Sequence, residues 1–130
     1  MKKETLKAIS DAMEEIGLNY EFMEWTGEIS YPYFTGEYTE TELISESGEQ
    51  EAVFILDGFA RDGSDSMAYL ELEDAKAKIA DCFPRINGRM VATQTGMAAI
   101  FYTNSFPVQM EDAALKRIQI NLTVKEWSVN

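Results

Sequence analysis

The stretch Arg117-Ile118-Gln119-Ile120-Asn121-Leu122-Thr123-Val124-Lys125, residues 117–125, alternates polar and aliphatic side chains without a break. Successive side chains of a β-strand point to opposite faces of the sheet, so a period of two is typical of a strand. The aliphatic set would lie on a core and the polar set in water. This stretch therefore predicts a sheet with one covered and one solvated face.

Two segments before it have the same kind of pattern and predict a hairpin. Residues 33–43 alternate, and residues 51–61 are apolar on both faces near their middle. The polar connection at residues 45–49 contains a glycine, as a hairpin loop does. Because a strand that is apolar on both faces is covered on both, we expect residues 51–61 to lie centrally in the sheet.

Further strands are predicted on either side of this hairpin. Residues 19–25 form an early strand, residues 90–92 a short one and residues 97–102 a longer one. Residues 105–113, which contain Pro107, are predicted to be an irregular connection.

Two segments have helical periodicity. Residues 3–16 place apolar side chains at spacings of three and four, and Gly17 suits the left-handed residue that ends a helix. A second helix is predicted over residues 67–83. It follows the polar loop 62–66, which is rich in capping residues, and Pro84 ends the helix. The predicted order is α-β-β-β-α-β-β(-β). Two helices packed on one face of a mainly antiparallel sheet is the natural α+β solution.

Composition limits the classes of function. With 130 residues the chain is expected to form a single domain, 1–130. It has 11 basic and 23 acidic residues and a net charge of −12, which argues against binding to nucleic acid or to an anionic membrane. It has no histidine and one cysteine, so His-dependent catalysis and Cys-rich metal sites are excluded. We expect no catalytic residues, no metal and no cofactor.

Location follows from the same inspection. The N-terminus leads into a charged amphipathic segment rather than the apolar run of a secretory signal, and no stretch approaches the ~20 apolar residues of a membrane span. We therefore expect a cytoplasmic protein.

Candidate chemistry is sparse. Asp57, Asp62 and Asp65 lie close together in sequence, but their spacing does not match a calcium loop, and a turn with a helix cap is the simpler interpretation. Cys82 lies on the apolar stripe of the second helix and is interpreted as a structural thiol. The alternative is a reactive thiol, with Lys78 as the local base.

Aromatic residues cluster between Trp25 and Tyr38, and include Tyr31 and Tyr33 beside Pro32. They suit either a core or a protein–protein contact, and the sequence leaves both interpretations open.

Charge is unevenly distributed along the chain. Between Ala8 and Ala60 there are 13 acidic residues and no Lys or Arg, whereas the rest of the chain holds 10 acidic and 11 basic residues. This pattern suits a solvated acidic surface, or a head-to-tail contact in which acidic and basic parts of neighbouring subunits meet. The candidate interface residues are Trp25, Tyr31, Tyr33, Glu37, Glu40, Arg85, Arg89, Arg117 and Lys125.

The order of these segments resembles a family of phage proteins. The resemblance lies in the N-terminal helix over residues 6–16, in residues 31–37 (YPYFTGE) and 53–59 (VFILDGF), in the second helix ending at residues 79–83 (IADCF), and in the closing strand 118–124. In these features the chain is similar to the tail-terminator (tail-completion) proteins of long-tailed bacteriophages, the lambda tail-terminator type.

The resemblance implies a non-enzymatic structural protein of a phage or prophage. Such a protein forms a homo-oligomeric ring, commonly of six subunits, that caps the tail tube, stops its polymerisation and docks the capsid connector. The partners implied are further copies of this chain and the tail-tube and connector proteins, and the final location is the virion. Two other hypotheses remain from the residues alone: a small partner- or ligand-binding α+β adaptor acting as monomer or dimer, and a carboxylate-dependent enzyme.

Overall fold

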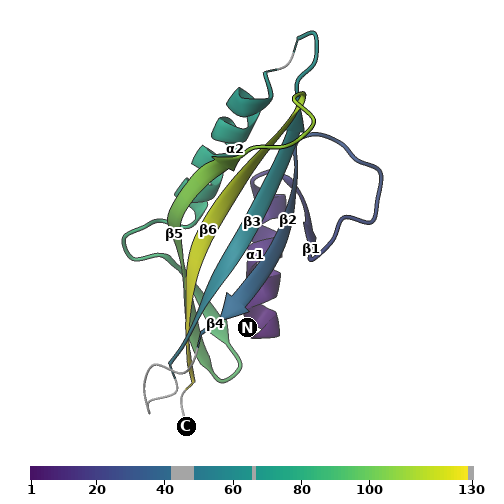
Figure 1. Ribbon diagram of the computed structural model, residues 1–130. Coiled ribbons are helices and arrows are strands. Elements are labelled where there is room, and N and C mark those ends of the chain that lie inside the picture. Colours follow the sequence, from purple (N-terminus) through teal and green to yellow (C-terminus); the bar gives the residue numbers. More distant parts are fainter. Residues whose placement is uncertain (42–48, 66, 129–130) are drawn as a thin grey trace.

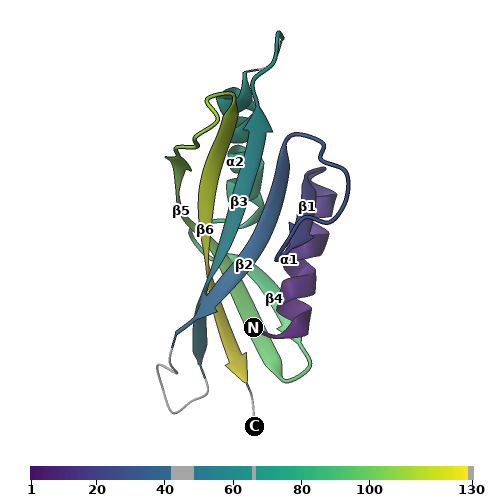
Figure 2. The same cartoon turned by 45° about the vertical axis from the view of Figure 1, so that its right-hand side comes forward.

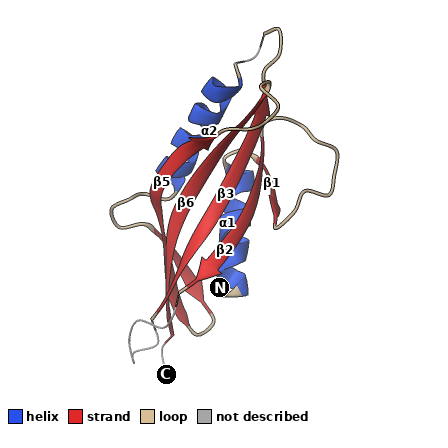
Figure 3. Cartoon of the chain, viewed as in Figure 1, coloured by secondary structure: helices blue, strands red, loops and turns tan. Residues whose placement is uncertain are grey.

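Six strands form one sheet, and two helices lie against one of its faces (Figures 1 and 3). The computed structural model describes residues 1–41, 49–65 and 67–128. The elements, in chain order, are α1 (Lys3–Glu15), β1 (Asn19–Phe22), β2 (Tyr33–Glu40), β3 (Gln50–Arg61), α2 (Ala68–Cys82), β4 (Arg89–Thr93), β5 (Gly96–Val108) and β6 (Leu115–Ser128). The predicted α+β class and the order α-β-β-β-α-β-β-β are confirmed.

The strands lie in the order β1-β2-β3-β6-β5-β4. Strand β1 pairs parallel with β2, and all the other pairs are antiparallel. Strand β3 lies between β2 and β6, which confirms its predicted central position. The alternating stretch 117–125 forms the middle of β6, with Ile118, Ile120, Leu122 and Val124 buried.

Both helices contribute to one apolar core between themselves and the sheet (Figure 2). Helix α1 supplies Ile9 and Met13, and helix α2 supplies Leu72 and Ile79, all fully buried. The opposite face of the sheet carries no helix in the described residues, and we call it the open face. Within the described ranges, neither helix has the length and apolar composition that a membrane crossing requires.

The pairing of β2 with β3 is shaped by two phenylalanines that pack over glycines. Phe34 is opposite Gly58 in the register, and a Cβ at Gly58 would lie 2.3 Å from the Phe34 ring. Similarly, a Cβ at Gly36 would lie 2.6 Å from the Phe54 ring. Each ring is fully buried, so each occupies space that only glycine leaves open.

Two predicted boundaries were wrong. The early strand ends at Phe22 rather than at residue 25, because Met23 adopts a left-handed backbone conformation (φ 71°). Residues 105–108 are not an irregular connection but continue β5 through Pro107. Strand β4 pairs only with the first part of β5, Gly96 to Ile100. Among the described residues no strand adjoins the outer side of β5 at Pro107, so its missing N–H is tolerated. The predicted hairpin connection at 45–49 falls largely outside the described residues.

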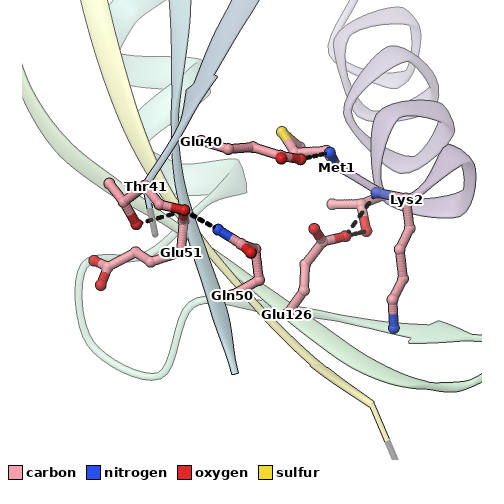
Figure 4. Close-up of polar contacts among 8 residues, drawn as sticks. Met1, Lys2, Glu40, Thr41, Gln50, Glu51 and Glu126 are labelled. Atoms are coloured by element: carbon pink, nitrogen blue, oxygen red, sulfur yellow. Dashed lines mark hydrogen bonds and ion pairs between the residues drawn. The ribbon is translucent and has the colours of Figure 1, made fainter. Parts of the chain in front are cut away.

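Helix α1 is held at its N-terminus by carboxylates from other elements (Figure 4). The N-cap residue, Lys2, has no side-chain cap, and its backbone N–H donates instead to Glu126 Oε2 of β6 at 3.0 Å. The Thr5 hydroxyl donates to the same oxygen at 2.7 Å, and the Met1 amino group pairs with Glu40 of β2. Glu126 is only 4% exposed, so these donors and the positive end of the helix dipole offset the burial of its charge.

We predict that Gly58→Ala lowers the free energy of unfolding by about 1–3 kcal/mol, because the added methyl group would displace the buried Phe34 ring. Urea denaturation followed by circular dichroism measures this loss. Gly27→Ala is the matched control, since no atom lies within 4 Å of a Cβ there. Equal stability of the two variants would contradict this account of the β2–β3 pairing.

We predict that Glu126→Ala also destabilises the protein, by about 1–3 kcal/mol, because it leaves the buried Thr5 hydroxyl and the half-buried Lys2 N–H without this acceptor. Glu126→Gln retains an acceptor oxygen and should lose less. The same denaturation experiment applies, with the exposed Glu111→Ala as control. A Glu126→Ala variant as stable as the control would show that α1 does not depend on this carboxylate.

Candidate functional site

The open face of the sheet presents a continuous array of polar and aromatic side chains. Its exposed or half-exposed residues include Thr35, Glu37 and Thr39 of β2, Val53, Ile55 and Phe59 of β3, and Gln119, Asn121, Thr123 and Lys125 of β6. Side-chain hydrogen bonds run across it, from Gln119 to Asn121 (3.0 Å) and from Asn121 to Asn104 of β5 (2.8 Å). These contacts order the surface without covering it.

Four aromatic rings gather where β2 and β3 meet on the open face. Tyr33 stacks on Phe59 with ring centroids 5.0 Å apart, and contacts Trp25 at 5.0 Å and Tyr31 at 5.7 Å. All four side chains are half-exposed, and we call them the aromatic cluster. Partial burial raises the pKa of the Tyr33 hydroxyl, and the neighbouring Tyr31 adds to this effect. The predicted aromatic candidates are therefore neither core residues nor isolated on the surface.

Arg117 borders the aromatic cluster and is fixed there by Asp57. Its Nε and Nη2 atoms donate to Asp57 Oδ1 at 3.0 and 2.8 Å, and its guanidinium lies 5.6 Å from the centre of the Phe59 ring. Asp57 is 8% exposed, so this pair is mostly withdrawn from water. Arg61 lies over Tyr31 at 5.7 Å on the other side of the cluster. Aromatic and arginine side chains in this arrangement are typical of protein–protein contacts.

Arg85 and Lys125 both line a depression of about 450 Å³, which is formed by residues of β3, β5 and β6 and by the connection that follows α2. The Arg85 guanidinium lies 5.1 Å from the centre of the Tyr102 ring, and the Lys125 ammonium lies 6.0 Å from that of Phe101. Glu51 also lines this site, which we call the basic depression.

The remaining predicted interface residues lie apart from these two places. Glu37 is exposed on the open face, and Glu40 pairs with the N-terminal amino group. Arg89 donates to Glu15 at 3.2 Å, near α1 and α2. The structure thus joins Trp25, Tyr31, Tyr33 and Arg117 in one group and Arg85 and Lys125 in another.

The cysteine and the loop carboxylates have structural partners. Burial raises the pKa of the Cys82 thiol, although the Arg89 guanidinium opposes the shift and donates to Sγ at 3.1 Å. Lys78 lines the same depression of about 470 Å³ as Cys82. Asp62 accepts a hydrogen bond from the backbone N–H of Ala68 at 2.9 Å, so it serves the start of α2 as predicted.

No metal centre or acid–base pair emerges from the described part of the chain. Among residues 1–41, 49–65 and 67–128, no three acidic or cysteine side chains are grouped so as to hold a metal ion. The pKa of the Glu4 carboxyl is lowered by the backbone N–H of Gln94, and that of Asp112 by the backbone N–H of Ala114. A general acid needs a shift in the opposite direction.

Phe59 and Tyr102 belong to these sites and were not among the predicted interface residues. The sequence did carry a signal for Phe59, since this aromatic side chain falls on the face of its strand opposite Phe54 and Leu56. The contact between Tyr102 and Arg85 depends on the course of the chain after α2, which no periodicity encodes.

Comparison with known proteins shows a likeness of fold. No family model matches the chain, and no curated protein matches it. Among solved structures, it is similar to a chain from a structure described as the virion of a native gene transfer agent particle, with a TM-score of 0.65 and 12% sequence identity. The match covers 92% of this chain and 87% of that one, so the two share the whole fold rather than one motif.

We predict that Arg117→Ala lowers the free energy of unfolding by about 1.5–3 kcal/mol, because it removes both donors from the largely buried Asp57 carboxylate. The double variant Asp57→Ala/Arg117→Ala should lose less than the sum of the two single variants, since each single change leaves a charged group unpaired. Urea denaturation of the four proteins measures this coupling. Lys3→Ala, at an exposed position of α1, is the control. Additive losses would mean that the pair contributes nothing specific.

Proposed function

We propose that this chain is a non-enzymatic structural protein of a phage or phage-derived particle. More specifically, it would be a tail-terminator or head–tail completion protein that forms a ring on the end of the tail tube. The observation that carries the proposal is the likeness of fold, over 92% of this chain, to a chain of a gene transfer agent virion. The order of elements predicted from the sequence leads to the same class of protein, and that order is observed.

The open face of the sheet supports a role in assembly. It is a broad, ordered surface with half-exposed Trp25, Tyr33 and Phe59 beside Arg117. Interfaces between proteins are enriched in such aromatic and arginine side chains. The aromatic side chains of this cluster pack against one another, so they lose little conformational freedom when a partner covers them.

The net charge suits a ring through which DNA passes. At −12 per subunit, the chain repels phosphates rather than holding them. A terminator ring would then bind tail-tube and connector proteins at its two ends without retaining the genome.

We predict that the purified protein forms a discrete ring-sized species, or converts to one from the monomer as its concentration rises. Light scattering on a size-exclusion column, at several loading concentrations, measures this. Adding the protein to assembling tail-tube subunits of the same phage should limit tube growth, as seen by electron microscopy.

A protein that stays monomeric at every concentration and leaves tube growth unchanged would contradict the proposal. That result would favour the alternative of a small partner- or ligand-binding adaptor.

A further inference from the structure

We propose that the basic depression of one copy of this chain receives the carboxylates of Glu24, Glu28 and Glu37 of a second copy. These three residues, which we call the acidic edge, lie in and after the connection that leads from β1 to β2. The inference rests on the proposed function and specifies how neighbouring subunits would recognise one another.

The cations of the basic depression are available to a partner. Neither Arg85 nor Lys125 forms an ion pair with another residue in the part of the chain that the structure describes. By contrast, Arg89 pairs with Glu15, Lys116 with Asp62 and Arg117 with Asp57.

The geometry of the depression suits carboxylates. The Arg85 guanidinium lies over the Tyr102 ring and the Lys125 ammonium over the Phe101 ring. The hydroxyls of Thr103 and Thr123 line the same hollow and hydrogen-bond to each other. A guanidinium and an ammonium in one hollow form a typical recognition site for carboxylates. Glu51 lies opposite Lys125 in the β3–β6 register and leaves the site with two cations facing one carboxylate.

The acidic edge has the complementary properties. Glu24, Glu28 and Glu37 are all exposed, and none forms an ion pair with residues 1–41, 49–65 or 67–128. The segment from Ala8 to Ala60, which contains the acidic edge, has no Lys or Arg that could neutralise these carboxylates. A partner that covers the acidic edge must bring positive charge.

The two surfaces extend toward different edges of the sheet. Strand β2, which carries Glu37, and its neighbour β1 are at one end of the strand order, whereas Arg85 precedes β4 at the other end and Lys125 lies on β6 nearer the middle. In Figure 1 the connection from β1 to β2 projects from one side of the sheet, and the connection from α2 to β4, which carries Arg85, projects from the other. Glu37 and Lys125 are separated on the open face by β3 and by four positions of the register, and the two surfaces form no ion pair with each other within the described part of one copy. A contact between unlike surfaces repeats from copy to copy and closes into a ring when the rotation allows.

The test uses two charge-reversal variants of the full chain. Arg85→Glu/Lys125→Glu makes the basic depression acidic, and Glu24→Lys/Glu28→Lys/Glu37→Lys makes the acidic edge basic. Each variant alone should need at least ~10-fold higher concentration than the wild type to associate, because like charges then face each other. An equimolar mixture should recover association, since each reversed surface now meets a complementary one. Light scattering on a column measures both effects.

Matched controls carry the same charge changes elsewhere. Lys3→Glu/Lys78→Glu and Glu14→Lys/Asp74→Lys/Asp81→Lys alter exposed positions of the helices and should associate like the wild type. Circular dichroism and urea midpoints verify that every variant is folded.

The outcomes separate the inference from the proposed function. If the wild type associates and Arg85→Glu/Lys125→Glu associates equally well, or if the mixture fails to recover association, the inference is overturned and the proposed function stands. If the folded wild type stays monomeric at every concentration and does not limit tube growth, both are overturned.

Discussion

The reciprocal packing of Phe34 over Gly58 and Phe54 over Gly36 is the constraint on which the arrangement of the sheet depends. The two rings are among the largest fully buried side chains, and both lie on the face that the helices cover. Glycine at positions 58 and 36 leaves the space that the two rings occupy, so the core fills without forcing β2 away from β3. Because side chains alternate along a strand, fixing these rings inward also fixes Tyr33 and Phe59 outward, where they form the aromatic cluster.

The sequence was sufficient to predict the fold class, the order of the elements and part of the site. The alternation at 117–125 and the two apolar faces of 51–61 reflect burial directly, so strand identity and the central place of β3 could be predicted. Strand ends depend on single residues in context. Pro107 is compatible with β5 only because β4 stops pairing at Ile100, and the positive φ of Met23 follows no sequence rule for methionine.

Charge was the property that sequence order described least well. The acidic first half and the neutral remainder suggested two separate surfaces, yet β3 and β6 pair along their full length and bring the halves together. Asp57 thus meets Arg117, and Glu15 meets Arg89, across 60 and 74 residues of sequence. Similarly, Glu126 accepts a hydrogen bond from Thr5 near the start of α1, and Glu40 pairs with the amino group of Met1. Many charged side chains form ion pairs within the fold. The charged side chains that have no such partner therefore indicate an interaction surface better than the net charge of each half of the sequence does.

This distinction decides how an acidic protein can associate with itself. Subunits with a net charge of −12 repel one another at long range, but at physiological ionic strength that repulsion is screened beyond about 8 Å. Charges brought into contact are screened far less, so a few complementary pairs outweigh the net repulsion once two surfaces meet. Association then depends on where unpaired cations lie, and a basic depression and an acidic edge at two separate places on one sheet give every added copy the same contact. The internal ion pairs sharpen this specificity, because they remove Arg89, Lys116 and Arg117 from competition for the same carboxylates.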